Sequence, residues 1–240
     1  MKTKLPIDGY DLRARLFPAL IVSLPILAFV YGAVPSARSF WGGVSGTVVE
    51  GAVLYALMRF GRDRGARLQK RLYQVWGGTP TTIMLRHRDT FLDPHTKERY
   101  KKTLARLSGL KFPSESEELA DPNGADAVYD SAIRNLLEQR RRPSDRLVFN
   151  ENCNYGFVRN LVGLKPIGLI TVFLTLAGDI FLYLRNATDH SGLWASALVT
   201  FLTGLVLLLF TEQSVRRTGD AYAVALLRTC EGPKGRSSAP

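Results

Sequence analysis

The chain has 240 residues, of which 46% are hydrophobic and 22% charged, and its formal net charge is +11. This composition excludes a disordered chain and a collagen, and two cysteines are too few for a disulfide-stapled secreted domain. The apolar residues lie in four blocks with the charged residues between them, so the averages describe neither region. The blocks predict membrane-spanning helices, and the positive charge predicts contact with anionic lipid headgroups.

The four apolar blocks cover residues 16–34, 42–58, 167–184 and 193–211. At about 1.5 Å of rise per residue, helices of this length cross the hydrocarbon layer, which is about 30 Å thick. A cleaved signal peptide is the alternative for the first block. Its apolar run is longer than is usual for a signal peptide, so we expect a retained anchor. The sequence thus predicts four spans.

Lysine and arginine are concentrated in residues 1–15, in the central segment and in the tail after the fourth block. The link inside each hairpin holds a single one, Arg38 in the first and Arg185 in the second. The positive-inside rule then places both termini and the central segment in the cytoplasm. The basic runs beside the spans are expected to bind anionic headgroups rather than nucleic acid.

The central segment, residues 59–166, contains two clear helix patterns, at 96–107 and at 121–142. The second begins with Asp121 and Pro122, a side-chain cap followed by proline at the first helical position. Between the two patterns we expect a polar loop, and at residues 146–149 a strand or an extended linker. The loop holds an acidic patch made of Glu115, Glu117 and Glu118.

The sequence therefore predicts an all-α membrane protein with two transmembrane hairpins and a helical cytoplasmic domain between them. Apolar residues recur at helical spacing after the second and fourth spans, so we expect both spans to continue as helices into the cytoplasm. The domains are an N-terminal segment and hairpin (1–58), the cytoplasmic domain (59–166), the second hairpin (167–211) and a C-terminal helix and tail (212–240).

Two acidic residues lie inside predicted spans, where a carboxylate costs roughly 2.5–3.5 kcal/mol on insertion scales. Glu50 shares a face with Gly42 and Gly46, a ridge of small residues that permits close helix packing. We expect Glu50 to face the bundle interior, either as a proton- or ion-responsive site or in a hydrogen bond to a residue such as Ser23 or Thr200. Asp179 lies nearer the external end of its span and could reach the membrane interface.

A glycine- and threonine-rich loop follows the second span. Gly77, Gly78 and Thr79 could bind an anion through backbone N–H groups and a hydroxyl, with Arg86 and Arg88 close by. The loop lacks a Walker lysine and a dinucleotide-binding glycine pattern. A helix stop at the two glycines followed by a helix cap is the simpler interpretation.

The segment before the third span is rich in asparagine and aromatic residues. Asparagine satisfies backbone groups in tight turns, and aromatic side chains suit the membrane–water interface. The alternative is a polar binding surface that this segment forms with the loop at Trp76. Its candidate residues are Asn150, Asn152, Asn154, Tyr155 and Arg159.

No metal-ligand spacing, catalytic triad or cofactor motif is present in the sequence, and we expect no metal and no cofactor. Three motifs, at 76–82 (W-G-G-x-P-T-T), 85–89 (L-R-H-R-D) and 154–166 (N-Y-G-F-x-R-N-x-x-G-x-K-P), occur in this order. In them the chain resembles a group of uncharacterised bacterial polytopic inner-membrane proteins. The resemblance implies a location in the bacterial inner membrane, and no activity.

Three functions remain compatible with these features. The leading hypothesis is a non-enzymatic membrane protein whose cytoplasmic module senses, scaffolds or binds a partner, either a protein or a second copy. The second is a small oligomeric pore, a proton-linked carrier or a membrane effector that uses Glu50. The third is an enzyme that acts on a phosphorylated or lipid substrate at the glycine-rich loop.

Overall fold

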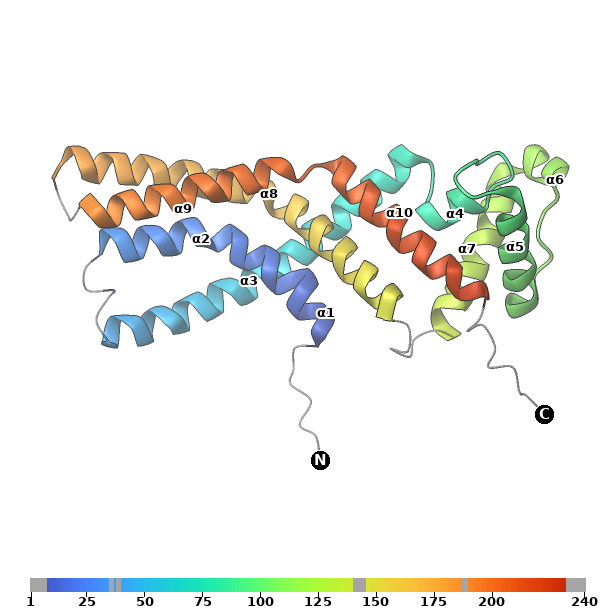
Figure 1. Cartoon of the computed structure of the whole chain (residues 1–240), viewed down its shortest axis with the longest axis horizontal. Coiled ribbons are helices and arrows are strands. Elements are labelled where there is room, and N and C mark those ends of the chain that lie inside the picture. The colour runs from blue at the N-terminus through green and yellow to red at the C-terminus, as the bar shows by residue number, and fades with distance from the viewer. Residues whose placement is uncertain (1–7, 35–36, 38–39, 140–145, 187–189, 232–240) are drawn as a thin grey trace, which may run out of the picture. The chain divides into compact units, whose positions relative to one another are not determined.

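The computed structural model describes residues 8–34, 37, 40–139, 146–186 and 190–231, with the backbone alone for residues 40–46. The described residues form helices joined by short turns and contain no strand. The all-α prediction is therefore confirmed (Figure 1). The chain divides into two compact units, Met1–Lys70 with Cys153–Val215 and Arg71–Asn152 with Arg216–Pro240, which we call the apolar unit and the helical module. The apolar unit thus includes 59–70 and 153–166, which the sequence assigned to the central domain.

Within the described ranges, three helical segments are long and apolar enough to cross a membrane: Gly9–Ala33, Arg146–Leu184 and His190–Leu209. They contain the predicted span 167–184 and most of the predicted spans 16–34 and 193–211. The first combines α1 (Gly9–Asp11), a π-helical turn (Leu12–Leu16) and α2 (Phe17–Ala33). The others are α8 (Arg146–Leu184) and α9 (His190–Leu209).

The predicted second span lies in α3 (Phe40–Trp76), which is not among these three helices and whose residues 40–46 are described by the backbone alone. Glycines and Glu50 lower its mean hydropathy. The helix does continue without a break to Trp76, as the sequence predicts for the residues after the second span. The fourth span behaves differently, because α9 ends at Leu209 and a separate helix, α10 (Glu212–Arg228), follows.

Within the apolar unit, α2, α8 and α9 pack through small residues. A Cβ atom on Gly32 of α2 would lie 2.5 Å from the carbonyl oxygen of Gly192 on α9, and one on Gly178 of α8 would lie 2.9 Å from the ring of Phe29. Such contacts require that the helix backbones approach closely. A small core of buried side chains supports them: Val22, Leu161, Leu164 and Leu207.

The helical module has its own apolar core. It contains α4 (Pro80–Leu85), α5 (Pro94–Ser108), α6 (Glu115–Ala120), α7 (Pro122–Gln139), α10 and a 3₁₀ turn (Thr229–Glu231). Leu104, Tyr129 and Leu136 are buried in this core, and α10 contributes Leu226 and Leu227. Local signals place the helix starts: Asp93 accepts from the Thr96 N–H at 2.9 Å and Asp121 from the Gly124 N–H at 2.9 Å.

Two local predictions for the module are wrong. The acidic loop is in part the helix α6, which begins with a capping box between Ser114 and Glu117. Residues 146–149 are neither a strand nor a linker but the first turn of α8. That helix is continuous to Leu184, so the asparagine-rich segment is helical and forms no tight turn.

Candidate functional site

The glycine- and threonine-rich loop is a helix stop followed by a helix cap. Gly77 and Gly78 have positive φ angles of 78° and 149°, and the Thr79 side chain accepts from the Thr82 N–H at 3.3 Å to cap α4. Arg86 returns to this loop and donates to the Gly77 carbonyl. A Cβ atom on Gly78 would lie 2.9 Å from the Arg86 guanidinium, so glycine is required there.

Arg86 is already paired with a carboxylate of the module. Its Nε and Nη2 atoms donate to Asp126 on α7 at 2.9 and 2.6 Å, a bidentate pair that raises the pKa of the guanidinium. The Thr82 hydroxyl donates to Asp130, one turn further along α7. Arg88 is exposed. Anion binding at this loop stays a prediction, but two carboxylates beside it make an anion less favourable there.

Glu118 is the centre of a buried polar network that the sequence did not indicate. Its side chain is 6% exposed and accepts from the Tyr129 hydroxyl at 2.7 Å and from the His87 N–H at 3.0 Å. Lys101, which is 5% exposed, donates to the Tyr129 hydroxyl at 3.2 Å. Lys97 donates to the Arg86 carbonyl at 2.7 Å. The network ties α5, α6 and α7 to the chain after α4.

Burial dominates the titration of this network. It lowers the pKa of Lys101 to about 8 and lowers the pKa of Lys97 as well, while burial raises the pKa of Tyr129. Both lysines are buried within the module. The network therefore acts as a structural tie between helices.

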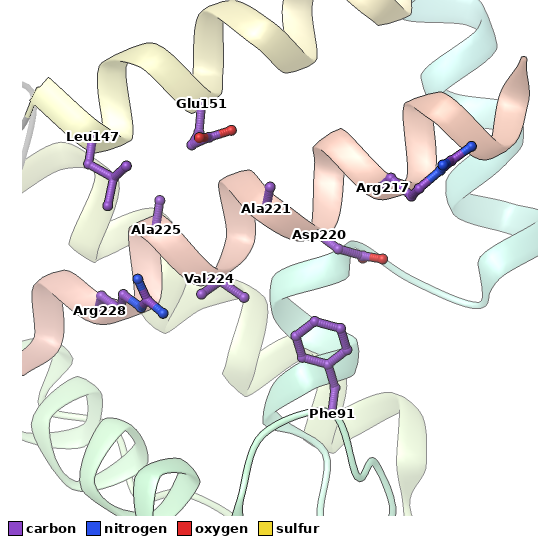
Figure 2. A pocket seen from close by; sticks show the side chains of 9 residues that line it. All are labelled: Phe91, Leu147, Glu151, Arg217, Asp220, Ala221, Val224, Ala225 and Arg228. Atoms are coloured by element: carbon purple, nitrogen blue, oxygen red, sulfur yellow. The ribbon is translucent and has the colours of Figure 1, made fainter. Parts of the chain in front are cut away.

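A groove of about 450 Å³ runs along α10 (Figure 2). Ala221, Val224 and Ala225 form its apolar floor, with Arg217 and Arg228 on the same helix face at its two ends. These positions recur at helical spacing, so one stripe of α10 carries a basic residue, small residues and a second basic residue. Leu147 and Glu151, in the first turns of α8, lie on one side of α10, and Phe91 lies on the other (Figure 2).

The groove has charged groups available for a ligand. Asp220 is paired with Arg216 on the same helix, at 3.0 Å, and burial raises its pKa. Among the described residues, neither Arg217 nor Arg228 forms an ion pair. The sequence did not indicate this site, because the apolar residues that recur at helical spacing after the fourth span, Tyr222, Leu226 and Leu227, mark another face of α10. Those residues pack in the core of the module. The sequence signal for the groove is the neighbouring stripe of α10, which runs from Arg217 through Ala221 and Ala225 to Arg228.

The candidate polar surface is divided between the two units. Asn150 and Asn152 belong to the helical module, whereas Asn154, Tyr155 and Arg159 belong to the apolar unit. Tyr155 is buried, and Arg159 lies over its ring at 5.7 Å and donates to Gln69. Arg159 therefore joins α8 to α3 within the apolar unit, and a shared binding surface stays a prediction.

Glu50 lies on α3 and is half-buried. Its neighbours Val48 and Val49 are 71% and 63% exposed, and a Cβ atom on Gly51 would meet nothing within 4 Å. The side chains of the other ridge positions, 42, 43 and 46, lie outside the described residues. Ser23, one suggested partner, donates to the Leu20 carbonyl at 2.9 Å. The functional role of Glu50 stays a prediction.

Asp179 is buried within the apolar unit. It is 4% exposed, and the Ser196 hydroxyl of α9 donates to its Oδ2 atom at 3.0 Å. The structure therefore places this carboxyl, rather than Glu50, in the most enclosed acidic position of the described apolar helices.

Comparisons with protein-family models, with curated proteins and with solved structures gave no match to this chain.

Proposed function

We propose that this protein is a multi-pass membrane protein of a bacterial inner membrane, with four spans in two hairpins and with both termini and the helical module in the cytoplasm. The exposed apolar faces of the apolar unit support a lipid environment, because side chains of this size are costly in water. On α8 they include Phe173 (71% exposed) and Leu184 (74%), and on α9 Leu209 (76%). The basic residues beside the spans support the orientation.

The number of spans is decided by α3. With α3 across the membrane, the N-terminus, the module and the C-terminus share one side. With three spans only, the N-terminus lies opposite the C-terminus.

Reporter fusions distinguish the two arrangements. We expect alkaline phosphatase to be active when it is fused after Arg38 and inactive after Leu119 or Pro240, with green fluorescent protein showing the opposite pattern. A phosphatase that is inactive after Arg38 and active after Leu119 would reverse the orientation. If the cytoplasmic reporter fluoresces after both Arg38 and Pro240, the two positions lie on the same side of the membrane and α3 does not cross it.

We further propose that the module functions by binding a helical segment of a protein partner in the groove along α10. The groove is the observation that carries this proposal. Ala221 and Ala225 lie one turn apart and leave room for a second helix to approach. Arg217 and Arg228 lie about 16 Å apart along the helix axis. They match a partner helix whose apolar face has an acidic residue at each end.

One side of the groove is formed by a helix that continues along the chain into a candidate span. Leu147 and Glu151 belong to α8, which continues as one helix to Leu184. A partner in the groove would therefore contact the first turns of a helix that also forms a candidate span. This supports a tethered binding unit whose occupancy is sensed by the membrane helices.

Photocrosslinking tests the groove. With benzoylphenylalanine at Ala221 of the full chain in membranes, we expect an adduct with a protein whose crosslinked peptide is an apolar helix with acidic ends. Reversing the charge of both Arg217 and Arg228 to glutamate should abolish the adduct, whereas Arg106→Glu, on an exposed part of α5, should preserve it.

The same probe at Leu119, which is 70% exposed on α6, provides the control for random collisions. An Ala221 adduct that is no stronger than the Leu119 background would contradict the proposal. An adduct between two copies of this chain, detected with two different tags, would assign the groove to self-association instead.

A further inference from the structure

The Asp179 carboxyl is enclosed by three helices of the apolar unit. Its Oδ2 atom accepts from Ser196 on α9, and a Cβ atom on Gly32 of α2 would lie 3.2 Å from the Ser196 Cβ atom. Its Oδ1 atom is buried and has no hydrogen-bond partner among the described residues. A buried carboxylate oxygen without a donor is costly, and it is more so at membrane depth.

A second oxygen without a hydrogen-bond partner lies at the interface between α8 and α9. The antiparallel register of α8 and α9 follows from three contacts: Asp179 with Ser196, Val172 with Gly204, and Gly168 with Leu207. This register places Thr175 opposite Thr200, one turn from Asp179 and Ser196 respectively. Thr200 is 0% exposed and its hydroxyl has no partner in the described part of the chain. The Thr203 hydroxyl, by contrast, donates to the Val199 carbonyl at 2.8 Å.

Among the described residues, Asp179 forms no ion pair with a basic side chain. The described stretches of α2, α8 and α9 from 17 to 33, 167 to 184 and 190 to 209 contain no lysine or arginine. The nearest titratable groups along the hairpin are Tyr183, Arg185 and His190. The Arg185 guanidinium lies over the Phe181 ring at 5.4 Å, and the tilted rings of Tyr183 and His190 have centroids 4.7 Å apart. The part of α3 predicted to span the membrane, 42–58, holds Glu50, which is acidic and cannot neutralise Asp179. An ionised carboxyl here would therefore be an uncompensated buried charge.

We propose that Asp179 is a proton-binding site of the membrane bundle, held as the neutral carboxylic acid with its proton on Oδ1. The Ser196 hydroxyl stabilises the other oxygen, and Thr175 and Thr200 lie one turn further along the interface of α8 and α9. A bound sodium ion is the alternative neutraliser, but it requires several converging oxygens, whereas a proton requires only the unpartnered oxygen of Asp179. The site gives the protein a proton-responsive element in addition to its proposed binding module.

Infrared spectroscopy of the full chain in lipid tests this site without requiring access by a reagent. We expect the C=O stretch of a protonated carboxyl at neutral pH, its loss at alkaline pH, and its absence from Asp179→Asn. The matched variant Glu50→Gln should keep the band. Ser196→Ala removes a hydrogen bond to the carboxyl that favours its ionised form, so the band should persist to higher pH.

Other results would overturn the proposal. A band that is unchanged in Asp179→Asn, or absent from the wild type at every pH, would show that Asp179 is not the neutral acid. A band that disappears when sodium is added at constant pH would assign the site to a cation. Gel filtration of each variant as a single symmetric peak establishes that a lost band reflects the missing carboxyl rather than unfolding.

Discussion

Replacing Glu118 with alanine is expected to destabilise the helical module by about 3–5 kcal/mol, because the change leaves buried groups without their partner. The Tyr129 hydroxyl and the His87 N–H would lose their acceptor. Lys101, which is 5% exposed, would lose the carboxylate nearest to its network. Its pKa would then fall further below the ordinary value, so that the module would carry a neutral lysine or pay the cost of burying its charge.

Thermal unfolding in detergent, together with hydrogen exchange of residues 115–139, measures this effect and locates it. Glu115→Ala is the matched control, since Glu115 lies in the same short helix but is exposed. It should cost no more than about 1 kcal/mol, the usual size of a helix-dipole contribution. Glu118→Gln keeps an acceptor and should fall between the two. Equal midpoints for Glu118→Ala and Glu115→Ala would contradict the structural role of the network.

Helices with strong local signals could be predicted from the sequence. Asp93 with Pro94 and Asp121 with Pro122 each supply a cap and a first helical residue, and α5 and α7 begin at those prolines. The three most apolar spans could likewise be predicted from the composition of short stretches of the chain. Such signals lie within one turn of the chain, so no knowledge of the tertiary structure was needed.

The buried network could not be predicted in this way. Glu117 and Glu118 are neighbours with the same chemistry, yet one caps α6 at the surface and the other is buried against Tyr129. Which glutamate is buried depends on the packing of α6 on α7, a tertiary contact that no local pattern records. The same reason explains Arg86, which the glycine-rich loop suggested as an anion ligand and which pairs with Asp126 forty residues later.

The asparagine-rich segment shows how tertiary contacts override local propensity. Asparagine favours turns, but Asn160 is 1% exposed and its side chain donates to the Ala14 carbonyl at 2.7 Å. Gly156 lies where a Cβ atom would meet the Ala14 Cβ at 2.8 Å. Close packing of the N-terminal helix on this part of α8 therefore favours a helix where the residues alone favour a turn.

The glycines at which helices approach each other closely could not be predicted from the glycine ridge in the sequence either. The ridge near Glu50 suggested close helix packing in that part of α3. A Cβ atom on Gly51, next to Glu50, would however meet nothing within 4 Å. The close approach of α3 occurs further along the helix, at Gly65. A Cβ atom on Gly163 of α8 would lie 2.8 Å from the Gly65 backbone nitrogen, and the Arg64 side chain donates to the Gly163 carbonyl at 3.0 Å.

Gly163→Leu is therefore expected to destabilise the apolar unit by at least about 1–3 kcal/mol, the usual cost of overpacking, because the new side chain meets backbone that cannot rotate away. Gly51→Leu is the matched control: both glycines are helical, and both substitutions gain about 0.8 kcal/mol of helix propensity. Thermal unfolding of the two variants in the same detergent should give a lower midpoint for Gly163→Leu only. Equal midpoints would mean that α3 and α8 do not approach at Gly65. A Gly51→Leu variant of normal midpoint but reduced oligomer mass would instead identify the ridge beside Glu50 as the surface between copies of the chain, since only a partner would then fill the space next to Gly51.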